Sequence, residues 1–199
     1  MKIAKAMARQ RTGKIREEAK LRQAMKQFQE HKKEEKEDSS MNGIINRIAC
    51  LRNLMETYHM DAYFVPTADF HESEYVGEHF ACRKYITGFT GSAGVALITK
   101  DWAGLWTDGR YFVQAAGELK DSGVELMKMG QPGVPTVEQY LEEHMPERGV
   151  LGFDGRVINS KTGEGLKERL ARKQVTICPD HDLIGEIWED RPEQIQSGS

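Results

Sequence analysis

Four side chains in two short segments could take part in chemistry. His71 and Glu74 lie in the segment HESEY, and Arg110 and Tyr111 lie in the segment WTDGRY. An arginine presents a planar fork of N–H donors that a carboxylate can meet with two hydrogen bonds, so we expect Glu74 and Arg110 to form a pair. His71 is the candidate beside them that titrates near neutral pH. These residue types suit the binding of a polar ligand, and an ordinary surface turn is the plainer alternative.

Two further motifs are weaker candidates. The segment GFTGSAG, residues 88–94, could bring backbone N–H groups close to a phosphate, but it opens a strand and lacks a GKS or GKT end. We therefore interpret it as a tight glycine turn that leaves no room for a Cβ atom. Ser92 lacks one of the two flanking glycines that a nucleophile elbow requires. The cluster Asp180-His181-Asp182 follows Pro179 in a predicted turn, and we do not expect it to bind a metal.

The elements that position these residues follow from the hydrophobic pattern. Short apolar runs bounded by Gly, Pro, Asp or Lys predict buried strands. These runs are residues 62–65, 94–99, 104–107, 124–129, 150–153 and 175–178. Helical patterns lie between or after them at residues 110–120, 136–145, 160–173 and 183–189. An earlier amphipathic helix has its apolar face at Ile44, Ile48, Leu51, Leu54, Met55 and Tyr58.

Alternation of strands and helices predicts an α/β fold, with a central sheet covered by helices on both faces. The connection between the strands at 94–99 and 104–107 is too short for a crossover, so these two strands should form an antiparallel hairpin. The sheet is therefore expected to be mixed.

Charge divides the chain of 199 residues near position 40. Residues 1–38 contain 12 Lys/Arg against 7 Asp/Glu, a balance of +5, whereas the whole chain carries −3. The same residues are strong helix formers without a sustained apolar seam, which predicts a solvated basic helical arm. The arm could contact nucleic acid or an acidic partner, but its interspersed glutamates argue against nucleic-acid binding. We expect an extension at 1–40, a globular domain at 41–192 and a flexible tail at 193–199.

Cysteine use and hydropathy indicate the compartment. Cys50, Cys82 and Cys178 are odd in number and far apart, so we expect reduced thiols. The sequence contains no run of about 18 apolar residues and no secretory signal pattern. A cytoplasmic protein with no membrane partner is predicted.

Several short motifs in one order resemble a known family. They include the strand that ends at Pro66, HESEY, GFTGSAG, WTDGRY, MKMG at 127–130, FDG at 153–155 and IWEDRP at 187–192. Residues 45–192 resemble the N-terminal, creatinase/prolidase-like domain of a bacterial-type Xaa-Pro aminopeptidase (aminopeptidase P). The resemblance implies a three-layer α/β/α arrangement around a mixed sheet. It also implies that Glu74 and Arg110, with His71 and Tyr111 beside them, reach toward a substrate cleft or an interdomain face.

The resemblance places the catalytic machinery elsewhere. Family enzymes cleave an N-terminal residue that precedes proline, at two divalent metals, Mn or Zn, held by two Asp, one His and two Glu in a later pita-bread domain. We therefore expect no catalytic residue and no metal ligand in this chain, and no peptidase activity from it alone. The implied partners are the pita-bread domain, a peptide substrate with proline at its second position and further copies of this chain in a homo-oligomer.

A second class of function stays open at this point. The chain could be a stand-alone binding or assembly module that has the same fold and no peptidase partner domain. An in-frame coding sequence for the five metal ligands downstream of codon 199 would favour the enzyme, whereas a natural stop codon would favour the module.

Overall fold

A computed structural model describes residues 43–66 and 81–193. The predicted basic arm, the tail and the segment that contains His71 and Glu74 lie outside these residues. The described part of the chain forms an α/β fold around a six-stranded sheet. None of its helices is both long and apolar enough to cross a lipid bilayer.

The sheet is mixed, as the sequence predicts. Its strands are β1 (Ala62–Pro66), β2 (Val95–Thr99), β3 (Ala103–Thr107), β4 (Glu125–Lys128), β5 (Val150–Gly152) and β6 (Thr176–Cys178). They lie in the order β4-β3-β2-β1-β5-β6. Strands β2 and β3 form the predicted antiparallel hairpin, and β1 and β2 are also antiparallel. The other neighbours, β3 with β4, β1 with β5 and β5 with β6, are parallel.

Each predicted helical region contains a helix, and the structure adds a short helix at Cys82–Thr87 that the hydrophobic pattern did not predict. Residues 43–57 are helical, and the later elements are α2 (Cys82–Thr87), η2 (Gly109–Tyr111), α3 (Phe112–Glu118), α4 (Val137–His144), α5 (Ser160–Leu170), η3 (Ala171–Lys173) and α6 (Leu183–Ile187). Local sequence fixes several of their starts. Thr136 and Gln139 form a capping box at α4, and the Asn159 side chain accepts the Thr162 N–H at α5. The pattern at 110–120 begins with a tighter 3-10 turn, and the Asp108 side chain caps it by accepting the Arg110 N–H.

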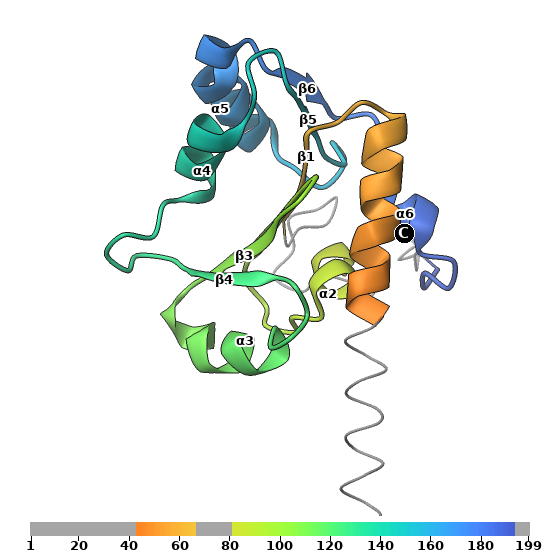
Figure 1. Ribbon diagram of the computed structural model, residues 1–199, viewed down its shortest axis with the longest axis vertical. Helices are drawn as coiled ribbons and strands as arrows, with labels where there is room; N and C mark the ends of the chain where they lie inside the picture. Colours follow the sequence, from red (N-terminus) through yellow and green to blue (C-terminus); the bar gives the residue numbers. More distant parts are fainter. Residues whose placement is uncertain (1–42, 67–80, 194–199) are drawn as a thin grey trace, which may run out of the picture. The chain divides into compact units, whose positions relative to one another are not determined.

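Side chains of the central strands alternate between the two faces of the sheet. Tyr63 and Val65 of β1 pack with the helix over 43–57 and with α2, α3 and α6, whereas Ala62 and Phe64 pack with α4 and α5. Figure 1 shows α4 and α5 on one side of the strands and α2, α6 and the orange helix on the other. The three layers expected from the sequence are therefore present, with one hydrophobic core on each face of the sheet.

An ionic network holds the last described residues against the core. Asp182 accepts hydrogen bonds from Arg191 at 2.5 Å and from Arg156 at 2.7 Å, and Arg156 also forms a two-bond fork with Asp154. Burial alone would raise the pKa of Asp182, but hydrogen bonds from Arg191 and from the Gly185 N–H lower it below its ordinary value. The network thus holds Arg191, which follows α6, next to Asp182 at the start of that helix.

The three cysteines are free, and they differ in exposure. Cys50 is exposed, whereas Cys82 and Cys178 are partly covered. Burial raises the pKa of the Cys82 thiol to about 12, although Arg191, which donates to its sulfur at 3.4 Å, opposes this shift. Cys82 is therefore held as a neutral thiol at physiological pH.

Truncation in the core should destabilise the domain far more than the same kind of change on its surface. Leu105 is fully buried in β3, so Leu105→Ala should lower the free energy of unfolding by about 2–5 kcal/mol. Val113 is 90% exposed, so Val113→Ala should change it by no more than about 0.5 kcal/mol. Urea denaturation of both variants checks this, and equal effects would contradict the placement of the core.

The raised pKa of Cys82 predicts selective thiol chemistry. Iodoacetamide at pH 8 should modify Cys50 in the native chain and should modify Cys82 only after unfolding, because the thiolate is the nucleophile. Since the neutral thiol is favoured in the fold, the stability that it contributes is complete below pH ~9 and is lost as pH rises toward 12. Peptide mass spectrometry after labelling checks the order, and native labelling of Cys82 as fast as that of Cys50 would contradict it.

Candidate functional site

The predicted site residues Arg110 and Tyr111 lie where β3 ends and η2 begins. Asp108 starts the turn, and its carboxylate accepts the backbone N–H of Arg110 at 3.0 Å. The Arg110 guanidinium then closes back onto the same carboxylate through Nε and Nη2, both at 2.9 Å. The Arg110 side chain is nevertheless 70% exposed. The Nε–Nη2 edge of the guanidinium is thus bound to Asp108, and the rest of the side chain faces solvent.

This local pair favours the charged form of both groups. The hydrogen bond from Arg110 holds the pKa of the Asp108 carboxyl below its usual range, and the hydrogen bond to Asp108 raises the pKa of the guanidinium. Both side chains therefore stay ionised at every pH near neutrality. Because the pair is exposed, it sets orientation more than it stabilises the fold.

Tyr111 ties this turn to the glycine segment. Its hydroxyl lies 2.5 Å from the Ser92 hydroxyl, and its ring meets the Phe89 ring edge to face at 5.8 Å. The Arg110 guanidinium lies over the same tyrosine ring at 5.2 Å. Residues predicted separately from WTDGRY and GFTGSAG therefore meet through Tyr111.

The glycine segment is a tight turn, as the sequence predicts. Gly88 ends α2 with a φ of 77°, a left-handed conformation that favours glycine. At Gly91 a Cβ atom would lie 2.2 Å from the Phe89 ring, so a larger residue would displace that ring. Thr90 then bonds Glu118 of α3 through its N–H at 2.9 Å and its hydroxyl at 2.6 Å. These contacts join the turn to α3.

An exposed surface surrounds Arg110. We name it the Arg110 face and define it by Ser92, Arg110, Tyr111, Val113 and Met129. Val113 of α3 is 90% exposed, and Met129, which follows β4, is 50% exposed. The Met129 N–H bonds the Thr107 carbonyl at 3.0 Å, which brings the end of β4 beside the start of η2. Exposed apolar and cationic side chains thus occur on neighbouring segments of the chain, a composition found at many interfaces.

A binding role for the four predicted site residues stays a prediction, and two of the four are not described by the structure. His71 and Glu74 lie outside the described residues, so the Glu74–Arg110 pair and a role for His71 stay predictions. Arg110 and Tyr111 are brought together, and Asp108 is a partner of Arg110 that the sequence reasoning missed. Aspartate at the start of a turn often accepts a hydrogen bond from the backbone two residues later, so Asp108 in Asp108-Gly109 could have indicated this contact with Arg110.

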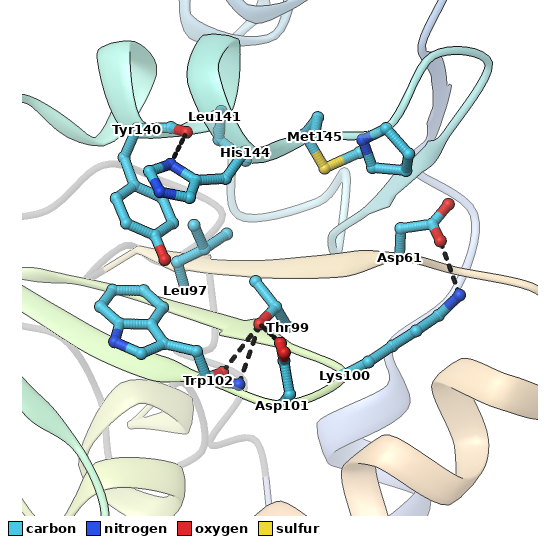
Figure 2. A pocket seen from close by; sticks show the side chains of 11 residues that line it. Asp61, Leu97, Thr99, Lys100, Asp101, Trp102, Tyr140, Leu141, His144 and Met145 are labelled. Carbon is cyan, nitrogen blue, oxygen red and sulfur yellow. Dashed lines mark hydrogen bonds and ion pairs between the residues drawn. The ribbon is translucent and has the colours of Figure 1, made fainter.

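A separate hollow of about 500 Å³ lies between α4 and the β2–β3 hairpin (Figure 2). Trp102, Tyr140 and His144 stack along one end, with ring centroids 4.4 Å and 3.9 Å apart. Asp61 lies at the other end, where it pairs with Lys100 at 2.7 Å and accepts the Val150 N–H at 2.9 Å. These contacts attach α4 and β5 to the hairpin, and neither Arg110 nor Tyr111 lines the hollow.

In the part of the chain that the structure describes, no three His, Cys, Asp or Glu side chains gather as a metal site would require. Asp182 of the Asp180-His181-Asp182 cluster is taken up by Arg156 and Arg191. Residues 43–66 and 81–193 therefore do not fit a two-metal centre, which needs several carboxylates around both cations. No step of metal chemistry is assigned to them.

Comparison with known proteins places this geometry in a family. Residues 47–186 match the model of the creatinase/prolidase N-terminal domain. The chain is 44% identical over 133 residues to Aminopeptidase P2 of Arabidopsis thaliana. The aligned residues make up 66% of this chain and 19% of that protein. The chain thus spans about a fifth of the length of this relative.

Two solved structures share the fold. One is X-prolyl aminopeptidase from Caenorhabditis elegans, described as a cytosolic enzyme with a di-nuclear active site. Its sequence is 33% identical, the TM-score is 0.71, and the match covers 75% of this chain and 26% of that one. The N-terminal domain of the cytoplasmic peptidase PepQ from Mycobacterium tuberculosis is 25% identical with a TM-score of 0.52, over 71% of this chain and 98% of that one. The chain therefore belongs to the creatinase/prolidase N-terminal domain family.

Proposed function

We propose that this chain is the non-catalytic N-terminal domain of an Xaa-Pro aminopeptidase. The whole enzyme would remove an N-terminal residue that precedes proline, at two Mn or Zn ions bound in a later pita-bread domain. The proposal rests on the 44% identity to an aminopeptidase P of which the chain spans only 19%. The remaining length of such a relative has ample room for a catalytic domain.

The Arg110 face is the surface through which we expect this domain to contact the catalytic domain and the substrate. Val113, at 90% exposure, and Met129, at 50%, present apolar surface that an isolated domain leaves in water. Arg110 offers a fixed cation beside them, and its fork is already oriented by Asp108. We infer that the apolar part packs on the catalytic domain, while Arg110 and Tyr111 donate hydrogen bonds to the peptide in the substrate cleft.

The proposal extends to assembly and location. We expect the enzyme to form a homo-oligomer to which this domain contributes. A cytosolic location is supported by the description of the nematode structure as a cytosolic enzyme. The second candidate is a stand-alone binding or assembly module, and it is supported by the PepQ N-terminal domain, whose structure was solved by itself.

The isolated chain should not hydrolyse an Xaa-Pro peptide, with or without added Mn²⁺. The reason is that the described residues do not form a ligand cluster for two cations. Release of the free N-terminal residue, measured by mass spectrometry, checks this, with the same gene extended through its downstream coding sequence as the positive control. Activity of the isolated chain that purifies with it and disappears with a chelator would contradict the proposal.

Arg110→Ala should impair the extended enzyme without unfolding this domain. We expect kcat/KM for an Xaa-Pro peptide to fall about 10- to 100-fold, as loss of a charge-assisted hydrogen bond would produce. The melting temperature of the isolated chain should hardly change, because the Arg110 side chain is 70% exposed.

The matched control is Arg169→Ala. Arg169 pairs with Glu142 at 3.6 Å between α5 and α4, and its side chain is half exposed. This variant should keep full activity. Equal activity of both variants would remove Arg110 from the cleft, and a double-mutant cycle of Arg110→Ala with Glu74→Ala tests their predicted pairing in the same assay.

A further inference from the structure

The hollow between α4 and the β2–β3 hairpin has the volume of a small-molecule site. It measures about 500 Å³, and sites for small ligands span about 300–1,000 Å³. Its floor is apolar, because the buried side chains of Leu97, Leu141 and Met145 line it. Figure 2 shows polar side chains, among them Asp101 and Tyr140, grouped around the same space. The hollow thus combines an apolar floor with a few polar groups, as ligand sites do.

The ion pair at one end of the hollow disfavours an anionic ligand. Asp61 accepts a hydrogen bond from the Lys100 ammonium at 2.7 Å with one carboxylate oxygen, and from the Val150 N–H at 2.9 Å with the other. An anionic ligand would have to compete with Asp61 for the Lys100 ammonium. Its occupant is therefore not expected to be a carboxylate or a phosphate.

Two other lining residues have oxygen atoms that a ligand could use. Among the residues that the structure describes, the Asp101 carboxylate accepts only the Thr99 hydroxyl, at 3.2 Å, and the Tyr140 hydroxyl has no hydrogen-bond partner. Arg52 lies near enough to feel the Asp101 charge, but its Nε donates to the Thr99 carbonyl at 2.9 Å. Within the same described residues it forms no ion pair with Asp101. The oxygens of Asp101 and Tyr140 can therefore accept hydrogen bonds from a ligand.

The charges that act on Tyr140 are negative. Burial raises the pKa of its hydroxyl, and the carboxylates of Glu125, Asp101 and Glu143 raise it further. No cation of the described residues opposes this shift. The Trp102 indole N–H donates to Glu125 at 2.8 Å and so holds that carboxylate beside the rings. A cationic group next to Tyr140 would therefore be attracted, whereas an anion would be repelled.

The ring stack fixes the position of the Tyr140 hydroxyl. Tyr140 stacks on Trp102 and on His144, and a Cβ atom at Gly104 would overlap the Trp102 ring, so glycine lets the stack lie close to β3. His144 is held in turn, because its Nδ1 lies 2.9 Å from the Tyr140 carbonyl oxygen. Other rings cover the faces of Tyr140, so its hydroxyl is the part that a ligand can bind. A group held in this way loses little freedom when a ligand binds.

We propose that this hollow binds a small molecule that carries an alkylguanidinium group. The alkyl part lies on the floor of Leu97, Leu141 and Met145, and the guanidinium donates hydrogen bonds to the Asp101 carboxylate and the Tyr140 hydroxyl. A guanidinium suits these two acceptors because its N–H donors point in several directions and because it is more weakly hydrated than an ammonium. The inference does not depend on the proposed peptidase activity.

The test is a titration of the full 199-residue chain, followed by the NMR signals of its backbone amides. Three probes have the same number of non-hydrogen atoms and differ in charge: butylguanidinium, the neutral butylurea and the anionic hexanoate. Butylguanidinium should shift the signals of Thr99, Trp102, Tyr140 and Leu141 in a saturable way, with a Kd of about 0.1–10 mM for a ligand of this size. The other two probes should bind at least about 10-fold more weakly.

Two variants test the acceptors one at a time. Asp101→Asn removes the charge of an exposed residue and should raise the Kd of butylguanidinium about 10-fold or more, because hydrogen bonds to a charged group are the stronger kind. Tyr140→Phe keeps the ring in the stack, removes the hydroxyl and should raise the Kd about 3-fold or more. The matched control is Asp121→Asn, in the exposed turn before β4, at a left-handed backbone conformation that asparagine also adopts. It removes the same charge and should change the Kd by less than about 2-fold.

Several results would overturn the proposal. They are the lack of a saturable shift with butylguanidinium, shifted signals outside the hollow, equal binding of butylurea or hexanoate, and parent affinity in Asp101→Asn. A blocked tripeptide with a central arginine tests the other source of the same chemical group. If it binds at least about 10-fold more tightly than butylguanidinium, the occupant is an arginine side chain of a polypeptide, and the small-molecule assignment is overturned.

Discussion

The arrangement of this domain depends on the burial of β1 at the middle of the sheet. It pairs antiparallel with β2 and parallel with β5, so both of its edges are closed. Tyr63 connects β1 to the start of α6. Its buried hydroxyl donates to the His181 carbonyl at 2.7 Å and accepts the Leu183 N–H at 3.1 Å. One side chain thus connects the first described strand to α6. Next to this contact, Asp182 binds Arg156 and Arg191, so the residues after α6 are also held in place.

The same rigid sheet presents the Arg110 face. Strand β3 is buried along its whole length, and the chain leaves it through a capped turn that orients Arg110. The neighbouring strand β4 ends beside this turn and exposes Met129. Groups placed on strand ends are held more firmly than groups on long loops. A rigid edge with a fixed cation and exposed apolar groups suits a surface that completes another domain's cleft.

Periodicity alone was enough to predict most of the fold. Runs such as Val-Ala-Leu-Ile at 95–98 are apolar on both faces, and the short link to the next strand allows only a hairpin. Helix α2 was missed because its six residues, which include Arg83 and Lys84, are too few to show a helical apolar period. Arg83 lies three residues before Ile86, and both side chains are buried on one face of this helix. The pairing of Arg110 with Asp108 depends on side-chain rotamers, which hydrophobic patterns do not encode.

Amide hydrogen exchange tests most directly whether the Arg110 face meets a catalytic domain. The isolated chain would be compared with the same sequence extended through its downstream coding region, by mass spectrometry of matched peptides. We predict that exchange slows in the extended protein for residues 88–94 and 109–118 and for the segment after β4, while α4 and α5 exchange as before. Unchanged exchange on the Arg110 face, or slowing confined to α4 and α5, would contradict the account.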